Sequence, residues 1–248
     1  LRNPLADPYL IGASAGAALG AALAIAFGLF GGPQAVPPLA FCGSLAAVAV
    51  VYRLARVGAR GVQVERLLLA GVAVSSFLSA LLSLALVARA ESFAQLYFWL
   101  VGGLSGRGWD QLALVTPYVV VAVVGVAYYT PRLNLLQLGE ETAAGLGVDV
   151  AKDQRAVIVL AALLTAAIVS VCGMIGFLGL VVPHLARLLV GPDLRKVLPT
   201  AALLGGALLT IADLAARVVW VPVEVPVGIL TALLGAPFFL YLLSRQRA

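Results

Sequence analysis

The sequence predicts an all-α protein, a bundle of helices that crosses a membrane about eight times. Three observations predict this fold class. Hydrophobic residues make up 62% of the 248 residues and charged residues only 11%, the mean hydropathy is +1.08, and the apolar residues form runs of about 20, the length that spans a bilayer. Soluble domains are about 45–50% apolar and about 25% charged. Too little polar sequence is left to cover a water-facing surface.

Turn-forming residues divide the apolar sequence into eight predicted spans, roughly 9–30, 36–55, 67–88, 111–129, 156–172, 174–190, 198–219 and 226–243. The predicted breaks are Gly31-Gly32-Pro33, Gly58 to Gly61, Gly102-Gly103, Pro131 and Pro222. The sixth span is short, rich in glycine and joined to the fifth with almost no loop, so a partly re-entrant segment is the alternative there.

The first predicted span carries Gly12, Gly16 and Gly20, which recur every four residues and therefore fall on nearly one face of a helix. Glycines in this arrangement let a neighbouring backbone approach closely. We expect them to pack helices within one chain, and a subunit interface is the alternative.

The third predicted span carries four serines at spacings that place them on one stripe, Ser75, Ser76, Ser79 and Ser83. Serine hydroxyls within a membrane can bond back to the carbonyls of their own helix, which is a structural role. A stripe of hydroxyls would also suit the wall of a water-filled pathway for a large polar substrate. Both interpretations stay open.

Two connecting segments are long enough to have a function of their own. Residues 89–110 combine glycine with the aromatic residues Phe93, Tyr97, Phe98, Trp99 and Trp109. Such residues suit the membrane interface, and a short gating or docking helix is the alternative. Residues 130–155 contain a short helix-like stretch from Leu138 to Gly147 that is too polar to span a membrane.

Asp213 and Arg217 form the one ionisable pair deep in an apolar run, and their i, i+4 spacing lets them neutralise each other. Charges inside a membrane are costly and mark function by default. A purely structural pair and a site at the outer surface, where Arg217 could meet an acidic partner, are the two interpretations.

No residues group into a catalytic set of nucleophile, base and acid. The phosphate-binding patterns GxxxxGK[ST] and GxGxxG are both missing from the sequence. His184 is the only histidine, and one histidine with two cysteines cannot complete a zinc site. We expect no enzyme activity, metal or cofactor on this chain, so any ATP hydrolysis would take place on another chain.

The basic residues predict the orientation, because cytoplasmic segments are enriched in Lys and Arg. Eight spans place both ends on one side of the membrane. If that side is the cytoplasm, only Arg89, Arg107 and Arg217 of the 16 basic residues lie outside. The net charge of +5 therefore indicates this bias rather than a nucleic-acid-binding patch.

A series of motifs extends in order over nearly the whole chain. They are Asn3-Pro4-Leu5-Ala6-Asp7-Pro8 through Gly12, Arg66 to Gly71, Phe98 to Gly103, Leu133 to Leu136, Leu138 to Gly147, Gly176 to His184, Ala212-Asp213 with Arg217, Pro226 to Gly228, and Gly235 to Pro237. With these motifs the chain resembles the FecCD-type permeases of importers for ferric siderophores, haem and cobalamin. That family has ten spans, so the resemblance implies the family fold without its first two helices.

The resemblance implies roles for particular residues. Arg217 would pair with a glutamate of a periplasmic binding protein, and the serine stripe would line the pathway. The loop that closes a cytoplasmic gate would contain Gln63, Val64 and Glu65. The helical segment that couples to an ATPase would comprise Leu138, Gly139, Glu140, Glu141, Ala144, Leu146 and Gly147.

The resemblance further implies a single transmembrane permease domain over residues 1–248, in the prokaryotic cytoplasmic (inner) membrane, with both ends in the cytoplasm. Its partners would be a second permease copy, two ATPase subunits that bind ATP and magnesium, and a periplasmic or lipid-anchored substrate-binding protein. The cargo would be a siderophore, haem or cobalamin, moved by alternating access. The alternatives are an ion-gradient-driven secondary transporter, which needs inverted repeats and midplane charges, and a membrane protein with a structural or assembly role.

Overall fold

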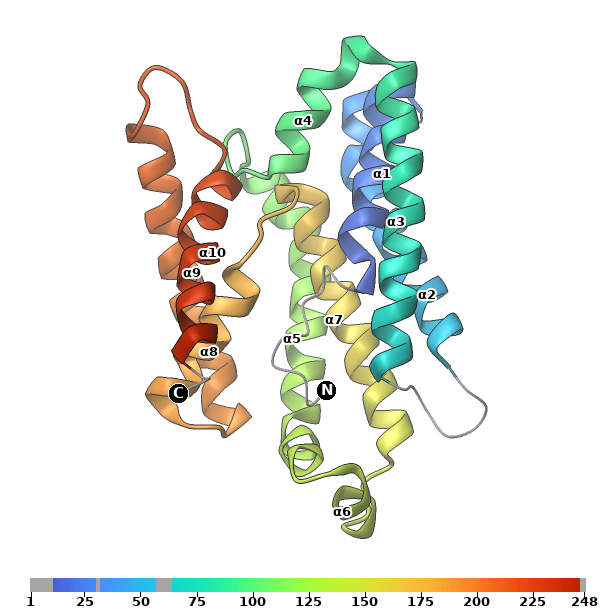
Figure 1. The fold of residues 1–248 in the computed structure, drawn as a ribbon, viewed down its shortest axis with the longest axis vertical. Helices are drawn as coiled ribbons and strands as arrows, with labels where there is room; N and C mark the ends of the chain where they lie inside the picture. Colours follow the sequence, from blue (N-terminus) through green and yellow to red (C-terminus); the bar gives the residue numbers. More distant parts are fainter. Residues whose placement is uncertain (1–10, 30–31, 57–63, 246–248) are drawn as a thin grey trace. The chain divides into compact units, whose positions relative to one another are not determined.

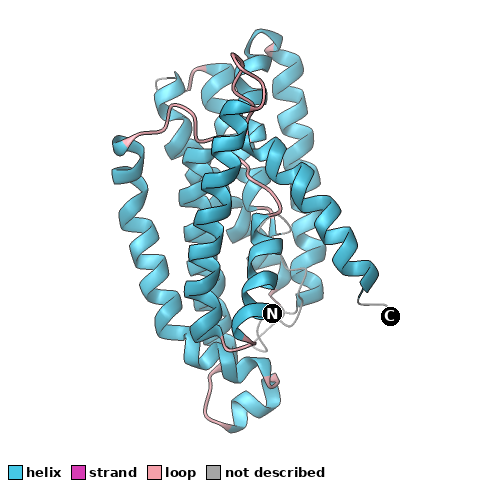
Figure 2. Cartoon of the chain, turned by 90° about the vertical axis from the view of Figure 1, so that its left-hand side faces the viewer, coloured by secondary structure: helices cyan, strands magenta, loops and turns pink. Residues whose placement is uncertain are grey.

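The computed structural model describes residues 11–29, 32–56 and 64–245. Figure 2 shows helices and loops in this part of the chain, and no strand. The all-α fold expected from the sequence is therefore confirmed. The α-helices are α1 (Ala13–Phe27), α2 (Val36–Ala55), α3 (Val64–Ala88), α4 (Phe93–Val101), α5 (Trp109–Gln137), α6 (Glu140–Gly145), α7 (Val150–Cys172), α8 (Leu178–Val190), α9 (Leu194–Val218) and α10 (Val227–Arg245).

The apolar helices lie where the sequence predicts the spans. Among the described residues, α2, α3, α5, α7 and α9 are long and apolar enough to cross a membrane, judged by length and composition, and α1, α8 and α10 are shorter apolar helices. The sixth predicted span is shorter than expected. Helix α8 begins only at Leu178, after a non-helical stretch that ends at Phe177 with a left-handed φ of 65°.

Helix α5 continues through Pro131, where the sequence analysis predicts a break, so that prediction is wrong. Proline cannot donate a backbone hydrogen bond. Thr130, directly before it, donates its hydroxyl to the carbonyl of Val126 at 2.7 Å, and Thr116 makes the same kind of bond before Pro117. Threonine hydroxyls of this kind help a membrane helix to tolerate proline.

The chain forms two compact units. The described residues within 1–97 and 107–171 belong to unit 1, and those within 98–106 and 172–248 belong to unit 2. In Figure 1, α1 to α3 and α5 to α7 are the helices of unit 1, and α8 to α10 are those of unit 2. The expectation of a single permease domain stays a prediction.

In unit 1, α1 and α2 approach each other backbone to backbone. A Cβ atom on Gly16 would overlap the carbonyl of Gly43, and one on Gly20 would overlap the carbonyl of Leu39. Gly12, at the start of α1, has a left-handed φ of 82°. The glycine spacing in the sequence therefore produces a close contact within the chain.

A hydrophobic core joins this pair of helices to α3 and α7. Its buried members come from four different helices. Several of them are alanines, and these small side chains let the helices come close together. They are Ala13, Val48, Val51, Ala55, Leu67, Ile158 and Ala162. Unit 1 therefore holds α2 and α7 in one packed core.

In unit 2, three chain segments meet at glycines. A Cβ atom on Gly102, Gly173 or Gly228 would overlap a backbone carbonyl of a neighbouring segment. The carbonyls belong to Met174, Trp99 and Val101, respectively. The amide of Gly103 also donates to the carbonyl of Cys172 at 2.8 Å. Non-helical backbone inside a membrane needs such internal partners.

Candidate functional site

A short helix, α6, connects the ends of α5 and α7 in unit 1. Glycines with positive φ bound it, Gly139 at 126° and Gly147 at 84°, and glycine adopts such backbone angles at little cost. Ala143 is fully buried beneath the helix. The sequence predicts this short helix, but α5 and α7 extend much further into the 130–155 segment than expected.

The outward face of α6 carries apolar and acidic side chains. Leu138 is 61% exposed and Leu146 is 59% exposed, one at each end of the helix. Glu140 and Glu141 are exposed between them. Leucines this exposed bury little of their surface against the chain itself, and beside the carboxylates they form a surface that another protein could cover.

An ion pair with one buried partner joins α5 to α7. Arg132 of α5 donates from Nη1 to Oδ1 of Asp153 in α7 at 3.1 Å. The carboxylate of Asp153 is only 1% exposed. The guanidinium of Arg132 also lies 5.4 Å from the ring centroid of Tyr128 and 5.7 Å from that of Tyr129, distances at which a cation is attracted to an aromatic face.

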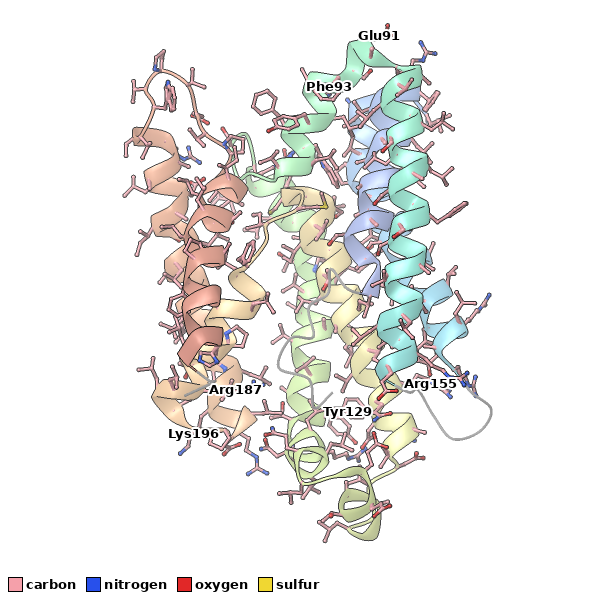
Figure 3. All side chains as sticks on the ribbon, in the orientation of Figure 1. Glu91, Phe93, Tyr129, Arg155, Arg187 and Lys196 are labelled. Atoms are coloured by element: carbon pink, nitrogen blue, oxygen red, sulfur yellow. The ribbon has the colours of Figure 1, made fainter. Side chains whose placement is uncertain are left out.

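The next two residues of α7 make further connections. Gln154 donates from Nε2 to Oε1 of Glu140 in α6 at 2.9 Å, and Arg155 donates from Nε to the hydroxyl of Tyr52 in α2 at 3.0 Å. Figure 3 shows Arg155 and Tyr129 at the end of unit 1 opposite to Glu91 and Phe93.

The predicted gate and pathway residues lie around α3. Gln63 falls outside the described residues, Val64 is the first residue of α3, and Glu65 is exposed in its first turn. The predicted stripe divides. Ser76, Ser79 and Ser83 are exposed.

Ser75 lies apart from the other three serines. Its hydroxyl is buried and has no hydrogen-bond partner among the described residues. A Cβ atom on Gly12 of α1 would lie 3.6 Å from it. Neighbouring residues of a helix point about 100° apart, so Ser75 turns inward to α1 while Ser76 stays on the exposed face.

The predicted docking residue lies at the end of α9 in unit 2. Arg217 donates from Nε to Oδ2 of Asp213 at 2.9 Å, so the expected i, i+4 pair forms. Close by in the sequence, the carboxylate of Glu224 accepts a hydrogen bond from the hydroxyl of Ser105. The intervening apolar residues are exposed, namely Val218, Val219, Trp220, Val221 and Val223.

The aromatic segment contains the short helix α4. Most aromatic residues of the segment 89–110 are exposed, namely Phe93, Tyr97, Phe98 and Trp109, and their place at a membrane interface stays a prediction. Trp99 differs, because it is buried and its indole Nε1 has no hydrogen-bond partner among the described residues.

Sequence reasoning missed the ion pair of Arg132 and Asp153. Asp153 stands in the polar run Lys152-Asp153-Gln154-Arg155, which is predicted from the sequence to lie in a connecting segment. Its partner Arg132 directly follows Pro131, the predicted break. Extending the fourth predicted span through Pro131, and starting the fifth at Val150, would have placed Arg132 and Asp153 in neighbouring helices. The wrong assignment of a break at Pro131 therefore hid their pairing.

No group of three or more His, Cys, Asp or Glu side chains that could hold a metal ion occurs among the residues with described positions. Four of the acidic residues each bond to one side chain of another kind instead, namely Asp153, Glu140, Asp213 and Glu224.

The comparisons with known proteins agree with this arrangement. The model of the FecCD transport family matches residues 1–245. The chain is 45% identical over 246 residues to the cobalamin import system permease protein BtuC of Halobacterium salinarum, a match that covers 98% of this chain and 64% of that protein. It is 42% identical over 256 residues to the hemin transport system permease protein HmuU of Yersinia pestis, covering 99% and 75%.

A solved structure is also similar. It is an inward-facing conformation of a metal-chelate type ABC transporter, with a TM-score of 0.90 and 33% sequence identity, and the match covers 98% of this chain and 77% of the other. The match to the halobacterial relative covers only 64% of the length of that protein. Together with the five long apolar helices, these relatives indicate a multi-pass membrane protein.

Proposed function

Because this chain belongs to the FecCD transport family, we propose that it is the permease part of an ATP-driven importer. The relatives of known cargo carry cobalamin or hemin by their names, so the proposed cargo is a large chelate of this class: cobalamin, haem or a ferric siderophore. The permease works as a homodimer with two ATPase subunits, which bind ATP and magnesium, and with one substrate-binding protein outside the cytoplasmic membrane.

The surface of α6 is the observation that carries this proposal. A short helix anchored at the junction of two long helices presents Leu138 and Leu146 with two carboxylates between them. Apolar anchors surrounded by charged groups are typical of protein interfaces. An ATPase subunit that grips this surface can move the ends of α5 and α7 when it binds nucleotide, and the pathway then opens alternately to the two sides.

The basic residues support the proposed orientation, with α6 on the cytoplasmic side and Arg217 outside. In this orientation Arg217 faces the substrate-binding protein, and the exposed serines Ser76, Ser79 and Ser83 of α3 contribute to the wall of the pathway. Neutral hydroxyls give a hydrated surface without a tight binding site, which suits release of a bulky chelate.

The experiment that tests the function uses the full-length gene product with its ATPase and binding protein in proteoliposomes. Cyanocobalamin, haemin and ferric citrate are supplied one at a time, and uptake and ATP hydrolysis are measured together. Uptake of one ligand that requires ATP supports the proposal. An assembled complex that takes up ligand equally well without ATP would contradict it and favour a secondary transporter.

Two charge reversals test the role of α6. Glu140→Arg and Glu141→Arg are each expected to reduce ATP-driven uptake, because the reversed charge would repel the basic ATPase groups that complement Glu140 and Glu141 in the proposed complex. Glu91→Arg is the matched control, since Glu91 is also exposed but lies at the other end of unit 1. Wild-type uptake in both α6 variants would rule out this contact surface.

A further inference from the structure

Three consecutive residues of α7 reach three different helices. We call Asp153, Gln154 and Arg155 the α7 hub. Consecutive side chains of an α-helix point about 100° apart, so the three diverge. Their partners are Arg132 in α5, Glu140 in α6 and Tyr52 in α2, at 3.1, 2.9 and 3.0 Å. All four helices belong to unit 1.

The centre of the hub is buried. Oδ1 of Asp153 accepts from Arg132, while Oδ2 is buried and has no hydrogen-bond partner among the described residues. Removing a carboxylate from water costs free energy that a single ion pair only partly offsets, so such a pair is a weak source of stability. What it does fix is geometry, because the buried charge holds its one partner at a defined place.

Helix α6 is attached firmly to the hub. The amide of Val148 donates to the carbonyl of Ala143 at 3.0 Å, which folds the end of α6 back toward α7. The side chain of Asp149 accepts from the amide of Lys152 at 3.1 Å and caps the start of α7. These two bonds lie at the connection between α6 and α7, and together with the bond from Gln154 to Glu140 they tie α6 to the first turns of α7.

We propose that the α7 hub positions α6 and passes its displacement on to α2 and α5. This inference rests on the proposed function of α6 as the contact for an ATPase. A pull on α6 reaches α7 through Gln154, and α7 carries it to α5 through Asp153 and to α2 through Arg155. If α6 were loosely tethered, it would move alone, and the ATPase would hydrolyse ATP without opening the pathway.

Each link of the hub has a conservative variant. Asp153→Asn removes the charge and keeps the shape, Gln154→Ala removes the bond to α6, and Tyr52→Phe removes one hydroxyl and keeps the ring. The matched control is Lys152→Gln, because the side chain of Lys152 is exposed in the same turn and makes no hydrogen bond or ion pair with the described residues.

The first measurement is the number of ligand molecules taken up per ATP hydrolysed, in proteoliposomes with the full-length chain, its ATPase and its binding protein. The ligand is whichever of cyanocobalamin, haemin or ferric citrate the wild type transports. We expect Asp153→Asn to lower this ratio about fivefold or more, the lower end of ordinary coupling between sites, and Gln154→Ala and Tyr52→Phe to lower it in the same direction. A purely structural role would reduce the amount of assembled complex and leave the ratio unchanged.

The second measurement is hydrogen exchange of the amides of residues 139–148 in the same full-length protein in detergent. The hub predicts faster exchange in Asp153→Asn and Gln154→Ala than in Lys152→Gln, because α6 loses its anchor. This arm does not depend on transport. If the wild type shows no ATP-driven uptake, the proposed function fails, and the exchange result alone decides whether the hub holds α6.

The proposal is overturned if all three variants keep the uptake ratio and the exchange rates of Lys152→Gln. It is also overturned if uptake falls only in proportion to the complex that assembles while exchange in α6 stays unchanged. If Asp153→Asn fails to fold, Tyr52→Phe tests the proposal through the number of ligands taken up per ATP. Gln154→Ala then tests it through the hydrogen exchange of α6.

Discussion

Arg132 and Asp153 share an ion pair 3.1 Å long but occupy unequal environments, since the side chain of Arg132 is 43% exposed and that of Asp153 is 1% exposed. The arginine can turn to water if its partner is lost, and it also contacts two tyrosine rings. The side chain of Asp153 cannot turn to water, because it is buried, and its Oδ2 has no other hydrogen-bond donor among the described residues. The two halves of the pair are therefore not equivalent.

This asymmetry predicts that Arg132→Gln destabilises the protein more than Asp153→Asn. The first variant leaves a buried carboxylate without its cation, whereas the second leaves a cation that reaches water. The measurement is the melting temperature of each purified variant in detergent, with Lys152→Gln as the control. Equal decreases in both variants would show that the burial of Asp153 does not set the cost.

Substitution of the neighbouring residues Gly102 and Gly103 by alanine should affect stability differently. Gly102 has a φ of 75° and a Cβ atom there would overlap the carbonyl of Met174, while a Cβ on Gly103 meets nothing within 4 Å. Gly102→Ala places an alanine in the left-handed region, which destabilises the folded protein by about 1–2 kcal/mol. The overlap with the Met174 carbonyl adds a cost of about 1–3 kcal/mol. We expect a melting temperature several degrees lower for Gly102→Ala and near the wild type for Gly103→Ala.

The close contact of α1 with α2 gives a second matched pair. Gly16→Ala drives a methyl group into the backbone of Gly43, whereas nothing lies within 4 Å of a Cβ on Gly206 in α9. We expect Gly16→Ala to cost about 1–3 kcal/mol and Gly206→Ala to cost nothing or to stabilise by up to about 1 kcal/mol through helix propensity. Chemical or thermal unfolding in detergent measures both, and a harmless Gly16→Ala would mean that α1 can move away from α2 freely.

The paired state of Arg217 leads to a prediction for docking. Arg217→Glu should weaken binding of the substrate-binding protein, and Asp213→Asn should strengthen it, because Asp213 competes for the same guanidinium. Arg195→Glu, at the opposite end of α9, is the control and should leave binding unchanged. Affinity is measured by surface-based binding at low and high salt, since salt screens exposed charges. An affinity that all three variants share with the wild type would contradict the docking role.

The fold was predictable from the sequence to a large extent, because hydrophobic runs of spanning length leave few alternatives to a helix bundle. The family resemblance drawn from the motifs is confirmed by the match to residues 1–245. Pro131 was misjudged since a proline ends helices in soluble proteins, whereas in α5 the hydroxyl of Thr130 bonds to the preceding turn.

The site was predictable only where its residues are close in sequence. Asp213 and Arg217 lie four residues apart on one helix, so their pairing follows from helix geometry alone. Arg132 and Asp153 are separated by a turn, a short helix and another turn, and their contact depends on how α5 and α7 pack. Ser75 shows the same limit, because its spacing places it near the other serines while its position against α1 turns it inward.

The consecutive placement of Asp153, Gln154 and Arg155 has a consequence for chain length. Deleting or inserting one residue between Val150 and Asp153 would turn all three side chains by about 100° around the α7 axis and shift them by about 1.5 Å along it. Contacts to α2, α5 and α6 would then be lost in a single step, which no single substitution does. Related proteins should therefore tolerate changes of sequence in this turn far better than changes of length.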